Sequence, residues 1–263
     1  MMAATGSITV VEYNLRAARR WWRSMVITGV ATPVLYVLAL GVGLGVVVNR
    51  NSGGALGVPY LQFVAPAFLT ASALQIAAGD ASYPILGGFK WERTFHGMAV
   101  TPLKPEEICS GMLLFMALRL VANSAIYLAI MACFDATRTW WVLLCIPIAA
   151  LTGMAFAAPL TALSASLQSD GAQFAVVFRF VVTPMFLFSG TFYPISELPG
   201  WGRWIAWLSP LWHGTELARD AGLGGGLSPP AVLGHLLYLL AWLGVGVALA
   251  RWRFRVRLEL GAS

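Results

Sequence analysis

Charged residues are scarce in this chain of 263 residues, at 11%, whereas ordinary soluble domains contain roughly 25%. Hydrophobic residues make up 59% of the chain. A water-soluble globule of this size could not hide so much apolar surface, because burial on folding levels off at roughly three quarters of the chain's area. Intrinsic disorder is excluded as well, since it requires low hydrophobicity and high net charge. The composition therefore predicts an integral membrane protein.

Cysteine and histidine are also rare, with three residues of each. The cysteines are odd in number and form no CxxC pair, so they indicate neither a disulfide framework nor a zinc site. The histidines are too widely spaced along the chain for a ligand pair on one helix, and we interpret them as structural or interfacial. The sequence thus predicts no metal site among Cys109, Cys133, Cys145, His96, His213 and His235.

Motifs for nucleotide binding and catalysis are lacking too. No GxxxxGK[ST] loop is present, and the glycine run at 224–226 lacks the lysine that follows such a loop. No Ser/His set, paired carboxylates or metal cluster converge in the membrane, as an embedded enzyme would require. Asp80 and Asp170 fall near span ends rather than at the mid-membrane depth typical of ion-coupled transporters.

Six stretches are long and apolar enough to cross a bilayer, which takes about 20 residues. The predicted fold is a single all-α transmembrane domain over residues 1–263. Its spans are predicted at 25–48, 60–78, 108–134, 140–163, 173–193 and 231–250, with a tail at 251–263. The first span carries no charge and is too long for the core of a signal peptide.

The basic residues predict the orientation. Eleven of the seventeen Lys and Arg residues lie before the first span, between the second and third spans, or after the last. Because basic residues are retained on the cytoplasmic side, both termini are expected there. The net charge of +6 is thereby explained without a nucleic-acid partner. Arg119 and Arg179 fall inside spans, where a charge is costly and often functional. We expect Arg179 to reach the interface and Arg119 to pair with a polar group across helices or, alternatively, with an acidic substrate headgroup.

An amphipathic helix is predicted at 8–24, where Val11, Leu15, Ala18 and Trp22 share one face. Such a helix lies in the membrane interface with its basic side toward anionic headgroups. It could serve as a topology anchor alone or also touch a cytoplasmic partner. Its basic side consists of Arg16, Arg19, Arg20 and Arg23.

The cytoplasmic connection 79–107 is more apolar than a solvated loop. Gly87 and Gly88 are predicted to break the preceding helix, and residues 89–98 to form a short helix of their own. Aromatic side chains with a charged rim are typical of protein interfaces, although these residues could instead pack against the helix at 8–24. The predicted docking residues are Phe89, Lys90, Trp91, Glu92, Arg93 and Phe95.

The segment 194–220 is too polar to span the membrane and too apolar for a plain loop. Gly190 and Pro194 are predicted to end the fifth span, and Trp201, Trp204 and Leu208 to share a helix face at headgroup level. We interpret the segment as a re-entrant structure that lines or caps a pathway on the outer side. The predicted pathway residues are Phe188, Ser189, Gly190, Phe192, Tyr193, Pro194, Trp201 and Trp204.

Specific motifs lie around this segment: Phe188-Ser189-Gly190-Thr191-Phe192-Tyr193-Pro194-Ile195, then Leu198-Pro199, Ser209-Pro210-Leu211 and Arg219. A looser motif, Thr101-Pro102-Leu103, follows the predicted cytoplasmic helix. In these motifs the chain resembles permease subunits of the type-2 ABC exporter family, over nearly its whole length. The family includes bacterial antibiotic, teichoic acid, polysaccharide and nodulation-factor exporters.

The resemblance implies a division of labour. Residues 89–98 would be the coupling helix that docks onto a separate ATPase subunit, residues 16–25 the elbow helix, and residues 194–220 the re-entrant external helices. Two permeases, identical or related, would face each other above two ATPase subunits. Those subunits would bind ATP and Mg²⁺, whereas this chain would bind no cofactor and catalyse no reaction.

We therefore expect one half of the membrane pathway of an ATP-driven exporter in a bacterial plasma membrane. The apolar, Trp-rich chain favours an amphipathic cargo, either antibiotic-like or lipid-linked. An ion-coupled secondary transporter is the first alternative, and a membrane-embedded enzyme is the second.

Overall fold

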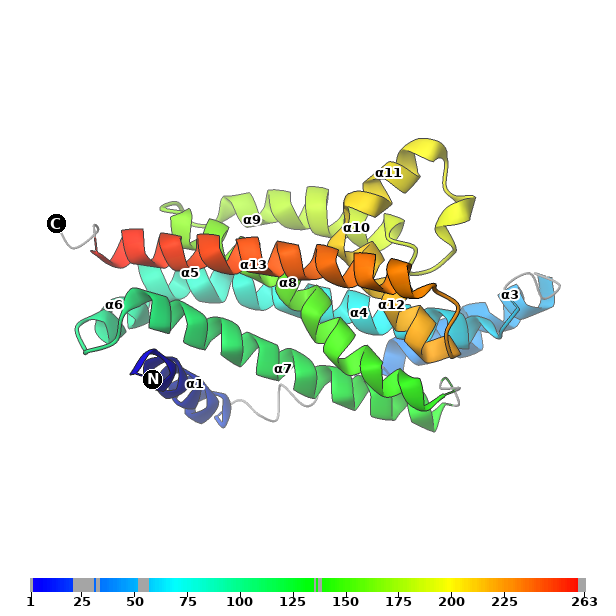
Figure 1. The fold of residues 1–263 in the computed structure, drawn as a ribbon, viewed down its shortest axis with the longest axis horizontal. Coiled ribbons are helices and arrows are strands. Elements are labelled where there is room, and N and C mark those ends of the chain that lie inside the picture. Colours follow the sequence, from blue (N-terminus) through cyan, green and yellow to red (C-terminus); the bar gives the residue numbers. More distant parts are fainter. Residues whose placement is uncertain are drawn as a thin grey trace.

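The computed structural model describes residues 2–20, 31, 34–51, 57–134, 136 and 139–259. Within these ranges the regular structure is entirely helical. The long helices α4 (Tyr60–Ala81), α7 (Pro105–Cys133), α8 (Cys145–Ser166) and α13 (Pro229–Glu259) form an elongated bundle (Figure 1). The prediction of an all-α protein is confirmed for this part of the chain.

α8 lies at the centre of the bundle and packs against α4, α7 and α13. Its interface is made largely of small residues: Ala149, Ala157 and Ala158 are fully buried. Small side chains let helix backbones approach closely, and the resulting van der Waals contacts hold the helices together in lipid, where there is no hydrophobic driving force between them. The packing of α8 therefore fixes the positions of the helices around it.

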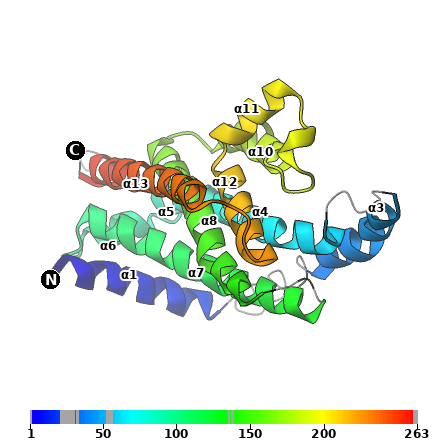
Figure 2. The ribbon, with the colours of Figure 1, turned by 45° about the vertical axis from the view of Figure 1, so that its right-hand side comes forward.

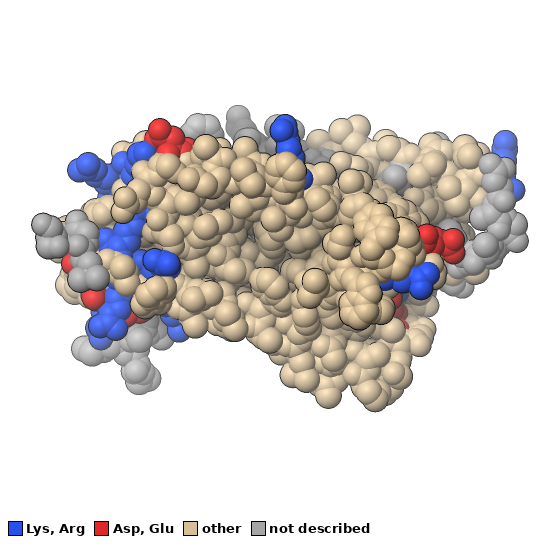
Figure 3. Space-filling view, turned by 90° about the horizontal axis from the view of Figure 1, so that it is seen from above, with Lys and Arg blue, Asp and Glu red and all other residues tan. Residues whose placement is uncertain are grey.

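Four described helical segments are long and apolar enough to cross a membrane: Tyr60–Lys90, Pro105–Cys133, Trp140–Ser166 and Pro229–Glu259. On the face drawn in Figure 3, charged side chains gather mostly at the two ends, and most of the surface between them is uncharged. An apolar belt between charged ends is the pattern of a bilayer-spanning protein. The chain is an integral membrane protein.

Two of the six predicted spans have no such counterpart among the described residues. The predicted span 173–193 corresponds to α9 (Ala172–Val177), η3 (Phe178–Val182) and α10 (Thr183–Phe188), a run of 17 residues that ends at a turn. Of the predicted span 25–48, residues 25–30, 32 and 33 lie outside the described residues. The remainder includes the π-helix η1 (Leu38–Leu44), which leads into α3 (Gly45–Asn51).

The short helix predicted at 89–98 is observed at Thr94–Ala99, so its predicted start and the predicted helix break at Gly87 and Gly88 are wrong. The glycines at 87 and 88 do not end the preceding helix, because α5 (Tyr83–Lys90) continues from α4 after a kink at Ser82. The short helix α6 (Thr94–Ala99) then begins after Arg93. Gly88 serves packing instead, since a Cβ there would lie 2.5 Å from the ring of Phe95.

The stretch predicted as a tail from residue 251 belongs, as far as Glu259, to the last helix. α13 continues without a break to Glu259. Phe254 and Leu258 are buried in the bundle, while arginines alternate with them along this stretch. Tertiary packing therefore extends the helix past the point where its hydropathy falls.

The amphipathic helix predicted at 8–24 is observed as α1 (Met2–Ala18), which packs against α7. Val10 and Val11 are buried there, whereas Leu15 is 49% exposed. The buried face is therefore rotated from the predicted face of Val11 and Leu15 toward Val10, because Val10 packs against Gly111 of α7. Trp22 and Arg23 lie outside the described residues.

Three short elements precede α13. The 3₁₀ turn η4 (Ile195–Glu197) leads into α11 (Gly200–Leu208), and Ser209 then caps α12 (Pro210–Leu223). α12 packs against α4, α8 and α13, whereas α11 stands out from the bundle (Figure 2). A Cβ at Gly214 would lie 2.1 Å from Thr152 Oγ1, so only glycine permits this approach of α12 to α8. The other 3₁₀ turn, η2 (Trp140–Leu144), leads into α8.

Candidate functional site

The residues between α5 and α7, here called the α6 corner (residues 89–100), are fastened to α13 by aromatic rings. Phe89 and Phe95 are each 2% exposed. Their ring centroids lie 4.8 and 5.2 Å from that of Phe254, and 4.8 Å from each other. The Arg257 guanidinium lies over the Phe89 ring at 4.3 Å and donates a hydrogen bond to the Ala165 carbonyl at the end of α8. The corner is thus a rigid part of the bundle.

The exposed side chains at the turn into α6 are one aromatic ring and two charged groups. Trp91 is 54% exposed, and Glu92 and Arg93 are exposed beside it. Arg93 has a positive φ of 52°, which turns the chain sharply into α6. Lys90 is half-buried and pairs with Asp170 at 2.6 Å. The predicted exposure of Phe89 and Phe95 is wrong, because these two rings form the internal support on which Trp91 and Arg93 are presented.

A groove separates the α6 corner from α1. Its volume is about 320 Å³, and it lies at the end of the bundle where α1 and the C-terminal end of α13 also lie (Figure 1). Phe89 and Phe95 do not close it, because they pack toward α13. The groove is lined by Thr9, Val10, Tyr13, Thr94, Gly97, Met98, Thr101 and Leu103.

A second corner lies where α10 ends, here called the α12 corner (residues 188–219). Gly190 adopts a positive φ of 73°, which reverses the chain directly after α10. Ser189 Oγ lies 2.9 Å from Ser209 Oγ, and Ser209 Oγ accepts a hydrogen bond from the Leu211 amide at the start of α12. Thr215 Oγ1 donates to the Ser189 carbonyl at 3.0 Å. Buried hydroxyl groups therefore join the end of α10 to α12.

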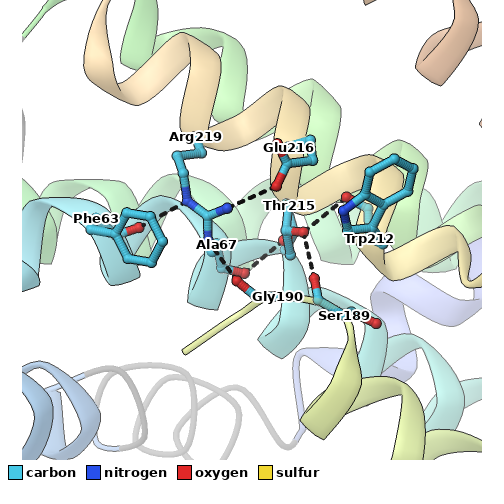
Figure 4. Close-up of polar contacts among 9 residues, drawn as sticks. Phe63, Ala67, Ser189, Gly190, Trp212, Thr215, Glu216 and Arg219 are labelled. Atoms are coloured by element: carbon cyan, nitrogen blue, oxygen red, sulfur yellow. Dashed lines mark hydrogen bonds and ion pairs between the residues drawn. The ribbon is translucent and has the colours of Figure 1, made fainter. Parts of the chain in front are cut away.

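Arg219 completes this corner and ties it to α4 (Figure 4). Its Nη2 donates to the Gly190 carbonyl at 2.6 Å, its Nη1 pairs with Glu216 at 2.9 Å, and its Nε donates to the Phe63 carbonyl at 3.4 Å. The guanidinium also lies 4.0 Å above the Phe63 ring. Arg219 is only 9% exposed. Burial lowers the pKa of Arg219, and the Glu216 carboxylate opposes that effect.

The remaining predicted pathway residues surround this network. Trp201 and Trp204 of α11 are 62% and 67% exposed and face away from the bundle. Phe188 contacts Trp201 with centroids 5.9 Å apart, and the Phe192 carbonyl accepts a hydrogen bond from Tyr60 Oη of α4. Tyr193 and Pro194 are half-buried on the connection to η4. The exposed tryptophans form the aromatic face that the spacing predicts.

An ion pair joins α4 and α7 inside the bundle. Arg119 Nη1 lies 2.6 Å from Asp80 Oδ1, and both side chains are largely buried. Asp80 Oδ2 and Arg119 Nε are buried without a hydrogen-bond partner. The sequence places Asp80 near a span end, but the continuation of α4 into α5 brings it inside the bundle. Arg179, in contrast, is exposed on η3.

Comparison with known proteins identifies the family of the chain. Residues 8–222 match the model of the family described as ABC-2 type transporter. The chain belongs to the ABC-2 type transporter family. Among its relatives, nodulation protein J of Rhizobium leguminosarum bv. viciae is 31% identical over 221 residues, which cover 82% of each chain. Nodulation protein J of Neorhizobium galegae is 30% identical over 252 residues, covering 94% of this chain and 93% of the relative.

Family membership makes this ABC-2 protein a transport subunit rather than an enzyme.

The C-terminal motif includes one of the two buried polar residues described above, Arg219, and omits the other, Asp80. Arg219 ends the C-terminal motif, yet only the structure shows that it holds the Gly190 turn. Asp80 is absent from the predicted site. The signal that could have identified it is the general rule that a buried arginine requires an acidic or carbonyl partner.

Proposed function

We propose that this ABC-2 family member is the transmembrane subunit of an ATP-driven exporter. The observation that carries the proposal is the α6 corner, where Trp91 and Arg93 are presented on a support that reaches α13 through buried rings. A force applied to these two residues is passed directly to a long membrane helix. The groove between α1 and α6 adds a second contact surface at the same end.

The energy source is proposed to be a separate ATPase subunit, which would bind ATP and Mg²⁺. This sequence contains no phosphate-binding loop of its own. The basic residues before the first span and along the end of α13 favour a cytoplasmic location for both termini. The proposed assembly is two permeases with six spans each, identical or related, above two ATPase subunits in a bacterial plasma membrane.

The proposed cargo is amphipathic, either drug-like or lipid-linked. A cavity of about 440 Å³ lies between α8, the 172–188 helical run, α11 and α13. This volume is within the usual range for small-molecule sites. Its wall is apolar except near Ser209, so a chain or ring system would suit it better than an ion. The relatives' name, nodulation protein J, associates them with nodulation and leaves the cargo of this chain open.

The test is co-purification of this chain with its proposed ATPase subunit, using the double variant Trp91→Ala, Arg93→Glu. We expect at least a ten-fold loss of ATPase association and of ATP-dependent transport. Trp140→Ala is the matched control, since Trp140 is an exposed tryptophan in η2, the turn that leads into α8, and is not part of the α6 corner. Association that survives the double variant, or that falls equally in Trp140→Ala, would refute the assignment of the α6 corner.

A further inference from the structure

The arginine-rich end of α13 is held against the start of α7 by polar contacts. Arg251 Nε donates a hydrogen bond to Ser110 Oγ at 2.9 Å, and Ser110 Oγ donates in turn to the Glu106 carbonyl. One turn further along α13, Arg255 Nε lies 3.8 Å from Glu106 Oε1. Residue numbers rise along α13 as they fall along α7, so the two helices run antiparallel here.

The Arg251 guanidinium keeps most of its donors for another partner. The hydrogen bond to Ser110 uses Nε alone, and neither Nη1 nor Nη2 has an acceptor among the described residues. The side chain is exposed. Two Nη groups in the fixed plane of a guanidinium match the oxygens of a phosphate, which arginine binds in a bidentate manner. Ser110 therefore holds Arg251 in a conformation that suits an anion.

The acidic groups next to Arg251 are compensated by another arginine. Arg255 lies between the Glu106 and Glu259 carboxylates, 3.1 Å from the latter. Arg253 follows on the same stretch of α13 and forms no ion pair among the described residues. The three arginines outnumber the two glutamates, so the local field favours an anion.

From Arg251 toward the middle of the bundle, α13 presents small exposed residues. Ala248 and Gly244 lie on the same side of the helix as Arg251, and both are exposed. A Cβ placed on Gly244 would meet no atom within 4 Å. Leu240 continues this side and is exposed as well. The helix therefore leaves room beside its apolar surface for a chain of methylene groups.

α7 extends this apolar surface on its own side. Leu114, Leu118 and Val121 follow Ser110 on one broad side of the helix, and each is at least 42% exposed. Val121 lies about 16 Å from Ser110 along the helix axis, at 1.5 Å per residue. The hydrocarbon part of one leaflet is about 15 Å thick, half of the bilayer core. The apolar surface next to Arg251 thus has the depth of one leaflet.

The depth of Arg251 separates it from the surface proposed for the ATPase. The α6 corner contacts α13 at Phe254 and Arg257, which lie between Arg251 and the end of the helix at Glu259. Arg251 lies about 12 Å before that end, at 1.5 Å per residue. The exposed Trp252 beside it is typical of the headgroup level of a membrane. An anion at Arg251 therefore belongs to the bilayer surface rather than to a protein docked on the α6 corner.

We propose that Arg251, oriented by Ser110, binds the phosphate of an anionic glycerophospholipid. One acyl chain of this lipid lies along Gly244 of α13 and Leu114 of α7. The positive charge complements the headgroup, and the apolar surface continues the bilayer contact that both helices make as spans. The bound lipid would hold α7 against the last turns of α13. Its leaflet follows from the orientation proposed above, whereas binding itself does not depend on the exporter assignment.

The test is titration of the full chain in neutral detergent with dioleoylphosphatidylglycerol or dioleoylphosphatidylcholine, followed by native mass spectrometry. The first phosphatidylglycerol should bind about five-fold more tightly than the first phosphatidylcholine. Arg251→Gln should reduce this ratio to about one, and Ser110→Ala, which keeps the charge but not its orientation, should reduce it about two-fold. Arg203→Gln, at an exposed arginine of α11, is the matched control and should bind as the parent does.

The acyl-chain contact is tested without changing charge. Gly244→Leu fills the space beside the chain and should weaken binding of both lipids about three-fold. Gly234→Leu is the matched control, because Gly234 is another exposed glycine of α13 with no atom within 4 Å of its added Cβ. Without added lipid, each variant should unfold at the temperature of the parent, so that weaker binding does not reflect loss of structure.

Three results would overturn the proposal. The preference for phosphatidylglycerol could survive Arg251→Gln or fall equally in Arg203→Gln. Glycerol phosphate could displace the lipid, which would make this a site for a free anion. Arg251→Gln could abolish co-purification with the ATPase, which would make this residue a protein contact. The lipid titrations involve neither ATP nor cargo, so failure here and failure of the exporter assignment are distinguishable.

Discussion

The α6 corner and the α12 corner lie toward opposite ends of the bundle and are fastened by different forces. At the α6 corner, three buried phenylalanine rings hold the chain to α13. At the α12 corner, the chain reverses at Gly190, and Thr215 and Arg219 donate hydrogen bonds to the Ser189 and Gly190 carbonyls. Apolar burial is non-directional and tolerates small displacements. Hydrogen bonds to a buried charge are directional and are lost together. The α6 corner is therefore suited to passing on a force, and the α12 corner to holding one conformation.

The largest effect is expected from removing the aromatic support of the α6 corner. Phe254→Ala leaves a cavity between Phe89 and Phe95 and should cost about 4 kcal/mol of unfolding free energy. The thermal unfolding midpoint in detergent is the measurement. Trp252→Ala is the control, because Trp252 is exposed on the same helix and should cost less than about 1 kcal/mol. Equal midpoints for the two variants would contradict the buried cluster.

Removing the charge that holds the α12 corner should cost somewhat less. Arg219→Leu leaves the Glu216 carboxylate and the Gly190 carbonyl without their partner, at about 3 kcal/mol. Arg219→Lys should not restore the midpoint, because an ammonium cannot reproduce three bonds in fixed directions. Arg203→Leu serves as the control, because Arg203 is an exposed arginine that donates to the Ser196 and Leu198 carbonyls of its own segment. A full rescue by lysine would show that charge alone matters at this corner.

The ion pair between α4 and α7 tests whether polar contacts matter outside the α12 corner, because it joins two long helices of the bundle. Arg119→Leu should cost about 2 kcal/mol, since it leaves the Asp80 carboxyl group inside the bundle without its partner. The double variant Arg119→Leu, Asp80→Leu should recover most of that loss. A double-mutant cycle on thermal midpoints measures the coupling. Additive effects would mean that the two side chains do not depend on each other.

Acid should weaken the α12 corner. Burial lowers the pKa of His213 to about 4, with the Trp207 carbonyl opposing the shift and His235 adding to it. A lowered histidine pKa means that the neutral ring stabilises the fold above pH 6.5 or so, and that this stability is lost as the pH falls toward 4. At pH 5.5 the loss should be about 1 kcal/mol, after allowance for partial exposure.

Unfolding midpoints at pH 7.5 and 5.5 measure this loss. His213→Asn should remove the His213 contribution to the pH dependence, whereas Phe254→Ala should keep it. If Phe254→Ala reduced the pH dependence as much as His213→Asn, the assignment of the effect to the α12 corner would be wrong.

Hydropathy predicted the long helices of the bundle, because a membrane helix satisfies its own backbone and must be apolar along most of its length. It could not predict which side chains meet. Phe89 and Phe95 were expected on the surface because their partner, Phe254, lay in a stretch interpreted as a tail. Asp80 was set aside because it lies near the end of a predicted span, whereas the helix continues past the kink at Ser82. His213 and His235 come together only through the packing of α12 against α13.

α13 passes both corners. His235 lies near its first turns and Phe254 near its last, which at 1.5 Å per residue places them about 28 Å apart along a single helix. The described helix has no proline after its first turn and no break in its hydrogen bonding. It therefore behaves as a rod rather than as two hinged halves. A rotation or tilt of α13 that displaces one end must displace the other, so the two corners move together.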